Sequence, residues 1–249
     1  MPKKRTNKRK FFSIIIPVLN DKVGLKKTIK SIIIQNFKDY EIIVIDGFSS
    51  DGTHNIIKKY KNKISKYIIE KDKGIYDAIN KGIKLSNGNY VNIINANDVY
   101  FNKFSLSKAH KYIIENNYDF LFGAVKKNKI YYKYEPNKMN WSFNFYPAHS
   151  GGFFVKKKIH EKIGFYNLKY PCSSDYDFFW KMIKTNKYNG GQTSEKDVIS
   201  KFASGGFSSK YSLFEHIIEE TLIRINNKQN KIFVLLLFFL RCLRHFSKI

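Results

Sequence analysis

Polar oxygen donors follow an apolar segment in the stretch GNYVNIINAND, which ends at Asp98. Asp98 is the only acidic residue of this cluster, and Asn95 and Asn97 supply neutral amide oxygens. Divalent metals on diphosphates take oxygen ligands, usually one or two carboxylates together with phosphate oxygens. The cluster therefore has two interpretations: a site for a metal-bound diphosphate with Asp98 on Mn²⁺ or Mg²⁺, or a polar turn that caps a strand.

A second acidic pair, Asp175 and Asp177, lies in SSDYDFFWKMI at the predicted start of a helix. Acidic residues are favourable in a first helical turn, and Ser173 or Ser174 can cap it, so a purely structural role is one interpretation. The other is that one carboxylate is a general base. Because alternate positions point in different directions, we expect only one of the two to face a site.

A third carboxylate, Asp46, ends the apolar run EIIVID and precedes the loop GFSSDGT. A carboxylate in this place can accept a hydrogen bond from a base N–H or a ribose hydroxyl. The sequence has neither GxxxxGK[ST] nor GxGxxG, so the usual phosphate-binding loops are absent. A nucleotide would have to be held by side chains at strand ends and by a metal.

The elements that would position these groups alternate along the first hundred residues. Apolar strands are predicted at 11–19, 41–46, 67–70 and 90–95, and amphipathic helices lie between them. This alternation predicts a parallel sheet with helices on its faces, and right-handed crossovers place the strand ends along one edge. Asn20, Asp46 and the cluster ending at Asp98 should therefore meet there.

The pattern changes after Asp119. FLFGAV and KIYYKYE resemble paired strands around a Lys-Asn turn, which predicts an antiparallel addition to the sheet. GGFFVKK, a helix, the SSDYD segment and the loop SGGFSSK follow, and two helices end the chain.

Composition limits the class of protein. With 249 residues and 43% hydrophobic content, the chain can form a sizeable core. Two cysteines exclude a disulfide framework and a cysteine-based zinc site, which fits a reducing compartment. The net charge of +25 favours polyanionic partners such as nucleic acid, anionic lipid or phosphorylated substrates, unless it reflects only lysine-rich usage.

The two ends of the chain are basic. Six of the first ten residues are Lys or Arg and no long apolar run follows, so no signal peptide is predicted. The segment IFVLLLFFL, residues 232–240, is too short to cross a bilayer, which takes about 20 helical residues. It either lies in a membrane interface or packs on the core as a final helix.

Five motifs in order resemble the inverting glycosyltransferases with the GT-A fold, the large group typified by bacterial polysaccharide enzymes. They span roughly two thirds of the chain: SIIIPVLN, EIIVIDGFSSDGT, EKDKGIYDAINKG, GNYVNIINANDVY and SSDYDFFWKM. The third motif is similar to the subgroup that acts in colanic-acid-type or O-antigen-type glycan assembly. The implied fold is an α/β GT-A domain with a mainly parallel central sheet, a small antiparallel addition and C-terminal helices.

The resemblance implies that a nucleotide-diphosphosugar donor lies across the strand ends and that its sugar passes to an acceptor hydroxyl with inversion. It implies a role for each matching residue: Pro17 and Asn20 line the nucleotide pocket, Asp46 contacts the base, Lys73, Gly74, Asp77 and Asn97 lie near the donor, Asp98 holds Mn²⁺ or Mg²⁺, Asp175 is the base, and His149 and Asp177 lie on the acceptor side. For His149 a structural role is the alternative interpretation.

One departure concerns the acidic motif, where Asn95 and Asn97 replace carboxylates that the family often has. Weaker metal binding would then let the metal arrive already bound to the donor, with lysines helping to stabilise the leaving diphosphate. A catalytically inactive, nucleotide-sugar-binding relative is therefore one rival. A nucleic-acid binder is another, motivated by the charge and by KIYYKY, although the basic residues are spread along the chain and no nucleic-acid motif is present.

The expected organisation is a disordered basic tail at 1–10, a catalytic domain at 11–210 and helices at 211–249. The catalytic domain divides into a nucleotide-sugar half at 11–100 and an acceptor half at 101–210. We expect a cytoplasmic protein that is peripheral on the inner face of an anionic membrane, with a glycan or lipid-linked glycan as acceptor.

Overall fold

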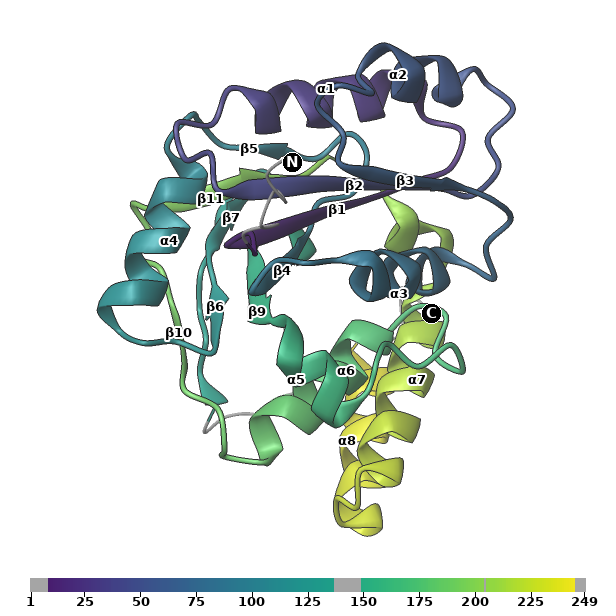
Figure 1. The fold of residues 1–249 in the computed structure, drawn as a ribbon. Coiled ribbons are helices and arrows are strands. Elements are labelled where there is room, and N and C mark those ends of the chain that lie inside the picture. Colours follow the sequence, from purple (N-terminus) through teal and green to yellow (C-terminus); the bar gives the residue numbers. More distant parts are fainter. Residues whose placement is uncertain (1–8, 137–148, 204, 245–249) are drawn as a thin grey trace.

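The structure is a computed structural model that describes residues 9–136, 149–203 and 205–244. A central seven-stranded sheet with helices on both faces dominates it (Figure 1). Along the sheet the strand order is β10 (Gly190–Gln192), β6 (Phe120–Phe122), β9 (Phe153–Lys156), β4 (Tyr90–Ile93), β1 (Phe12–Val18), β2 (Tyr40–Asp46) and β3 (Lys66–Ile69). The predicted GT-A-like α/β architecture with a mainly parallel sheet is confirmed.

The sheet is parallel where the sequence alternates. β1 pairs in parallel with β2 on one side and with β4 on the other, so that Val18 is level with Asp46. All seven residues of β1 are buried, because helices cover both of its faces. Ile14 and Ile16 belong to the core under α1 (Lys22–Ile33), α2 (Thr53–Lys59) and α4 (Ser105–Glu115).

The opposite face of the sheet carries α3 (Ile75–Leu85), α5 (Lys157–Ile163) and α6 (Ser174–Lys184). Helix α3 approaches β1 closely at Gly82, where a Cβ atom would lie 2.4 Å from the Ile15 side chain. On the other face, α1 begins at the N-cap Asp21, whose carboxylate accepts a hydrogen bond from the Gly24 N–H at 2.7 Å. These contacts fix both helices over the ends of the central strands.

A smaller sheet lies beside the first and has the order β5 (Val99–Tyr100), β11 (Val198–Lys201), β7 (Ala124–Lys126) and β8 (Ile130–Tyr131). β7 and β8 are antiparallel, as predicted for the Lys-Asn turn. The prediction that FLFGAV is one strand is wrong. It divides at Gly123, because β6 joins the large sheet and β7 the small one.

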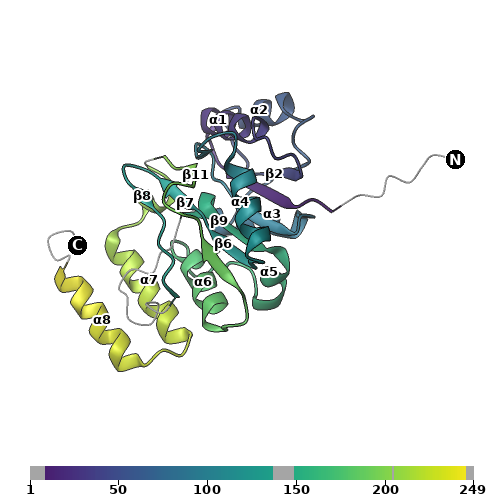
Figure 2. The same cartoon turned by 90° about the vertical axis from the view of Figure 1, so that its left-hand side faces the viewer.

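The chain ends in a helical pair, α7 (Leu213–Asn226) and α8 (Lys231–Arg244). A capping box between Ser212 and Glu215 begins α7. α7 packs on α6, and α8 packs on α7 as the outermost helix of the domain (Figure 2). Within the described parts of the chain no helix has the length and apolar character needed to cross a membrane. Most of the predicted basic tail, residues 1–8, lies outside the described residues.

Candidate functional site

A cavity of about 780 Å³ opens at the carboxyl ends of β1, β2 and β4. Pro17, near the end of β1, and Gly47, directly after β2, line the floor of this cavity. Gly74, Asn97 and His149, three further predicted site residues, also line it. The strand ends therefore meet around one cavity, as expected for a parallel sheet.

Asp46 lies beside this floor and is fully buried. Its Oδ1 accepts hydrogen bonds from the Ser49 N–H at 3.0 Å and from the Ser49 hydroxyl at 2.5 Å. Its Oδ2 has no hydrogen-bond partner among the described residues. Because a buried carboxylate oxygen is costly to leave unpaired, this atom is a candidate acceptor for a ligand N–H or O–H.

Asp46 itself does not line the cavity, and neither do three further predicted donor residues, which hold the loops around it. Asn20 bridges two loops, since its amide oxygen accepts from the Ser50 N–H at 2.8 Å. Asp77, in the first turn of α3, accepts from the backbone N–H of Lys73 at 3.0 Å. Lys73 and Asp77 do not line the cavity, because Asp77 closes the turn at the start of its own helix, and the expectation that they lie near the donor stays a prediction.

Asp72 lines the cavity in their place, and the sequence analysis did not select it. Its carboxylate accepts from Lys81 Nζ at 2.6 Å, and the same ammonium contacts Asp77 Oδ2 at 3.3 Å. Burial raises the pKa of Asp72, and the Lys81 contact partly offsets this. Both acids lie in the motif EKDKGIYDAINKG, but Asp72 is in the loop before α3 and Asp77 is in the first turn of the helix.

Asp98 and Asn95 form the oxygen-rich part of the cavity wall. Asp98 Oδ1 accepts from the Ala203 N–H at 3.0 Å, and Asn95 Nδ2 lies 3.4 Å from Asp98 Oδ2. Asn95 Oδ1 is buried with no partner among the described residues. Burial raises the pKa of Asp98 to about 7, against smaller lowering effects of the Ala203 and Asn95 hydrogen bonds.

His149 lies beside this cluster, with Nδ1 3.8 Å from Asp98 Oδ2. Its ring stacks on Phe202 with a centroid separation of 4.4 Å, and Lys127 Nζ lies 5.4 Å from the centroid of that phenyl ring. Burial lowers the pKa of His149 to about 4, so the imidazole is neutral at physiological pH. Lys127 also lines the cavity and is its cationic group nearest this stack.

Asp175 lines the same cavity from the first turn of α6. Its Oδ1 accepts from the Tyr76 hydroxyl at 3.0 Å and from the Tyr176 N–H at 2.9 Å. Burial raises the pKa of Asp175 to about 6, although the Tyr76 hydrogen bond and nearby His216 lower it. A carboxylate with this pKa is mostly ionised at neutral pH and matched to proton abstraction.

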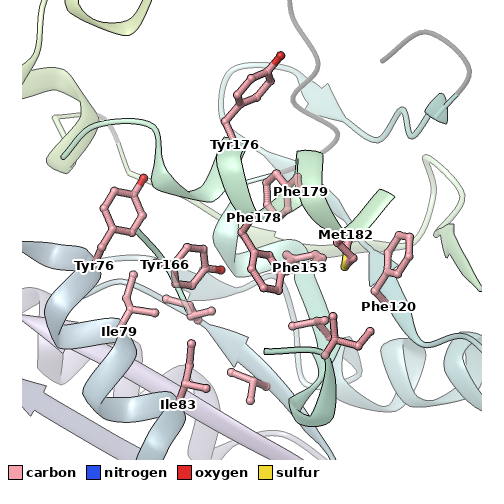
Figure 3. Close-up of a cluster of buried hydrophobic side chains, with 14 of the residues drawn as sticks. Tyr76, Ile79, Ile83, Phe120, Phe153, Tyr166, Tyr176, Phe178, Phe179 and Met182 are labelled. Atoms are coloured by element: carbon pink, nitrogen blue, oxygen red, sulfur yellow. The ribbon is translucent and has the colours of Figure 1, made fainter. Parts of the chain in front are cut away.

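Tyr76 comes from α3 and reaches across to α6, and Figure 3 shows it beside Tyr166 at the edge of the aromatic core. Burial and the neighbouring Asp175 raise the pKa of Tyr76 well above its ordinary value, so its hydroxyl stays protonated and donates. A tyrosine in this place can either line the pocket or pack in the core. It does both, since it lines the cavity and is only 9% exposed.

Asp177 does not line the cavity. Its carboxylate contacts Lys181 Nζ at 2.6 Å and accepts from Asn227 Nδ2 at 2.9 Å, and the residue is 2% exposed. Of the two acids of SSDYD, only Asp175 therefore lines the cavity, and its role as the base stays a prediction. The acceptor-side position predicted for Asp177 stays a prediction, and in this structure its side chain joins α6 to the end of α7.

The far wall of the cavity is built by the C-terminal helices. Leu213, His216 and Glu220 contribute from α7, and Arg241 contributes from α8, where it is ion-paired with Glu220. We call this part the α7–α8 end of the cavity. No motif of the sequence analysis reached these residues, which the chain brings to the site only by folding its last helices back on α6.

Residues 13–185 match the family model of the Glycosyl transferase family 2. The chain therefore belongs to glycosyl transferase family 2, and it is a glycosyltransferase. Among curated relatives, a PGL/p-HBAD biosynthesis glycosyltransferase of Mycobacterium tuberculosis is 29% identical over 175 residues, which cover 67% of each chain. An uncharacterised glycosyltransferase of Rickettsia conorii is 29% identical over 191 residues, covering 69% of this chain and 31% of its own length.

Solved glycosyltransferase structures share the fold. S. aureus TarS 1-349 in complex with UDP-GlcNAc superimposes with a TM-score of 0.67 at 19% identity, over 95% of this chain and 73% of that one. The mannosyltransferase PcManGT from Pyrobaculum calidifontis, in complex with GDP-Man and Mn²⁺, gives 0.65 at 18% identity over 90% and 66%. Against a longer TarS chain, this chain covers 44% of the length.

Proposed function

We propose that this chain transfers a sugar from a nucleotide-diphosphosugar to an acceptor hydroxyl with inversion, in the assembly of a cell-surface glycan. The observation that carries the proposal is one cavity lined at one place by the oxygen donors Asp98 and Asn95 and at another by Asp175. The first pair suits a metal-bound diphosphate, and the second group suits an acceptor hydroxyl.

Nucleotide binding at the strand ends is supported by Asp46 and by the adjoining cavity residues Pro17 and Gly47. The unpartnered Oδ2 of Asp46 would accept from the donor's base. TarS is solved with UDP and with UDP-GlcNAc, and PcManGT with GDP-Man, so related folds hold diphosphonucleotide donors. We propose that the present chain also binds a donor of this class.

The residues around Asp98 fit a divalent metal held jointly by protein and donor. Among the described residues no three or more His, Cys, Asp and Glu side chains gather in a metal-binding group. However, the buried, unpartnered Oδ1 of Asn95 adjoins the Asp98 carboxylate, and both are hard oxygen ligands. Asp98 and Asn95 would hold Mn²⁺ or Mg²⁺ together with diphosphate oxygens, and the ion would supply Lewis-acid stabilisation of the leaving group.

Asp175 performs the acid–base step in this proposal. Its carboxylate takes the proton of the acceptor hydroxyl while that oxygen forms a bond to the anomeric carbon. The bond from this carbon to the diphosphate oxygen breaks, and the nucleoside diphosphate leaves with the electron pair. Attack from the face opposite the leaving group inverts the anomeric configuration. Tyr76 holds the carboxylate in place through its hydroxyl.

The proposal is tested by nucleoside diphosphate release from UDP-, GDP-, CDP- and TDP-sugars, measured with added Mn²⁺ and with a chelator. Release from one donor class that stops in the Asp175→Asn variant supports the assignment, and NMR of the product tests inversion. Binding of a donor without release in any acceptor mixture would favour the inactive, nucleotide-sugar-binding relative. We place the active chain on the cytoplasmic side of a membrane, with a glycan or lipid-linked glycan as acceptor.

A further inference from the structure

The outer face of α8 is apolar, although it is exposed. Ile232, Phe239 and Leu243 are 81%, 60% and 71% exposed. Exposed apolar residues recur along α8 at intervals of three and four, which places them on one side of the helix: Ile232, Leu235, Leu236, Phe239, Leu240 and Leu243. On a helix that faces only water this side would be polar.

The inner face of α8 already accounts for its packing on the protein. Val234, Leu237 and Arg241 are its buried residues, and at 100° per residue they lie opposite the exposed stripe. The sequence left two alternatives for this segment, docking on the core or lying in a membrane interface. The structure satisfies the first with the inner face and leaves the outer face for a partner.

Helix α7 also exposes apolar residues. Phe214, Ile218 and Leu222 are exposed at intervals of four residues, and the Phe214 ring lies 6.3 Å from the Phe238 ring of α8. We call the nine exposed residues of the two helices the α7–α8 apolar surface. Both helices of a packed pair therefore expose several apolar side chains, which is more than the scattered single apolar residues that monomers commonly expose.

The charge around this surface identifies the partner. After Glu220 the sequence contains six Lys and Arg residues and no Asp or Glu. Lys231 and Arg244 are exposed at the two ends of α8. The acids of the adjoining α7 turn include Glu219, which accepts from the Ser173 N–H at 2.8 Å, and Glu220, which pairs with Arg241. An apolar stripe flanked by cations is complementary to an anionic bilayer.

A second copy of the chain fits less well. Each copy carries a net charge of +25, so two copies repel each other at this basic end. The fourteen residues of α8 extend about 21 Å, too short to span a bilayer but sufficient to lie in the plane of its headgroups.

The same two helices form the α7–α8 end of the cavity. His216 lines it from α7 and Arg241 from the inner face of α8, on the side of Asp175. We infer that the α7–α8 apolar surface docks on an anionic membrane and thereby holds this end of the cavity at the bilayer. The acceptor class that fits this placement is a lipid-linked glycan, a point that rests on the proposed function, whereas the docking itself does not.

The test is flotation of the full chain with vesicles of phosphatidylcholine, with and without phosphatidylglycerol. The stripe variant replaces two exposed residues of α8, Leu236→Glu and Phe239→Glu, which are 55% and 60% exposed. The matched control replaces Ile114→Glu on α4 and Ile34→Glu at the C-cap of α1, which are 57% and 60% exposed. We expect binding to anionic vesicles to fall at least about tenfold in the stripe variant and to stay within about twofold in the control.

Equal flotation of the stripe variant and the wild type would overturn the docking surface. Equal binding of the wild type to neutral and anionic vesicles would overturn the choice of an anionic partner. A wild-type dimer in light scattering that the stripe variant dissociates would replace the membrane by a second copy. Thermal shifts with nucleoside diphosphates, measured in parallel, show that the variant is folded. If the wild type shows no such shift, the proposed function fails while the flotation result still decides the docking.

Discussion

Replacing Asp175 by Asn should abolish turnover and at the same time stabilise the protein. Burial raises the pKa of this carboxyl from 3.8 to about 6, so the folded state binds its proton more tightly than the unfolded state. At neutral pH the Asp175 carboxylate is therefore ionised in surroundings that disfavour its charge, which lowers the free energy of unfolding. At 1.36 kcal/mol per pKa unit, the cost is at most about 3 kcal/mol, and partial exposure reduces it to roughly half.

The Asn variant removes that charge without removing the hydrogen bonds. Both the Tyr76 hydroxyl and the Tyr176 N–H bind Oδ1, which an amide oxygen replaces. We expect a gain of about 1–2 kcal/mol at pH 7.5, or roughly 3–6 °C in melting temperature. Because the wild type loses this stability as the pH rises from about 4 through 6, the gain should vanish below about pH 4.

Thermal unfolding from pH 4 to 8 and donor turnover at pH 7.5 are the assays. Turnover should fall at least about a hundredfold with the loss of a general base. Asp177→Asn is the matched control on the same helix. That carboxylate is 2% exposed and paired with Lys181, so its replacement should cost about 1–2 kcal/mol and leave turnover within about threefold. Destabilisation by Asp175→Asn at pH 7.5, or turnover within tenfold of the wild type, would refute the reasoning.

Three further variants test other parts of the site and fold. Tyr76→Phe removes the hydrogen bond that stabilises the Asp175 carboxylate. The acid limb of the pH profile of kcat/KM should therefore move to higher pH, and kcat should fall about tenfold. An acid limb that does not move would contradict this prediction. Asp46→Asn should weaken nucleoside diphosphate binding about tenfold or more in calorimetry while leaving stability unchanged or higher, and equal affinity would exclude the contact with the base. Gly88→Ala places a Cβ 2.6 Å from the Ser13 nitrogen and should lower the free energy of unfolding in urea by about 2–3 kcal/mol. Its control, Gly206→Ala, has open space around the new Cβ and should lower it by less than about 0.5 kcal/mol.

The first half of the fold could be predicted because one physical signal determines it. Strands covered on both faces read as continuous apolar runs, and the predicted segment 41–46 differs from β2 (Tyr40–Asp46) by one residue. Parallel topology alone predicted that the end of β2, at Gly47, and the Asp98 cluster line one cavity. In the second half, consecutive short strands belong to different sheets. The local sequence pattern could not show that the chain passes from one sheet to the other at Gly123, between β6 and β7.

The site residues divide in a similar way. The place of Pro17 and Asp98 at the cavity could be predicted because motif and strand-end position agree, and that of Asp175 followed from its motif alone. Asp72 was not separated from Asp77, because both are acids in one motif, and the path of the loop before α3, which brings Asp72 to the cavity, has no periodic signal in the sequence. His216 and Arg241 come from helices that lie beyond the matched family residues 13–185. They line the same cavity as Asp175 only because of tertiary packing, which the periodicity of the sequence does not reveal.

The central claim is that the strand-end cavity binds a nucleoside diphosphate through a metal held by Asp98. Isothermal titration of UDP, GDP, CDP and TDP into the wild type, with Mn²⁺ and with a chelator, tests it most directly. Asp98→Asn keeps an acceptor for the Ala203 N–H but removes the charge, and Asp177→Asn is the control outside the cavity. We predict metal-dependent binding of one nucleotide class in the wild type and in the control, and loss of the metal dependence in Asp98→Asn. Undiminished metal-dependent binding in Asp98→Asn, or no binding of any of the four nucleotides to the wild type, would contradict the account.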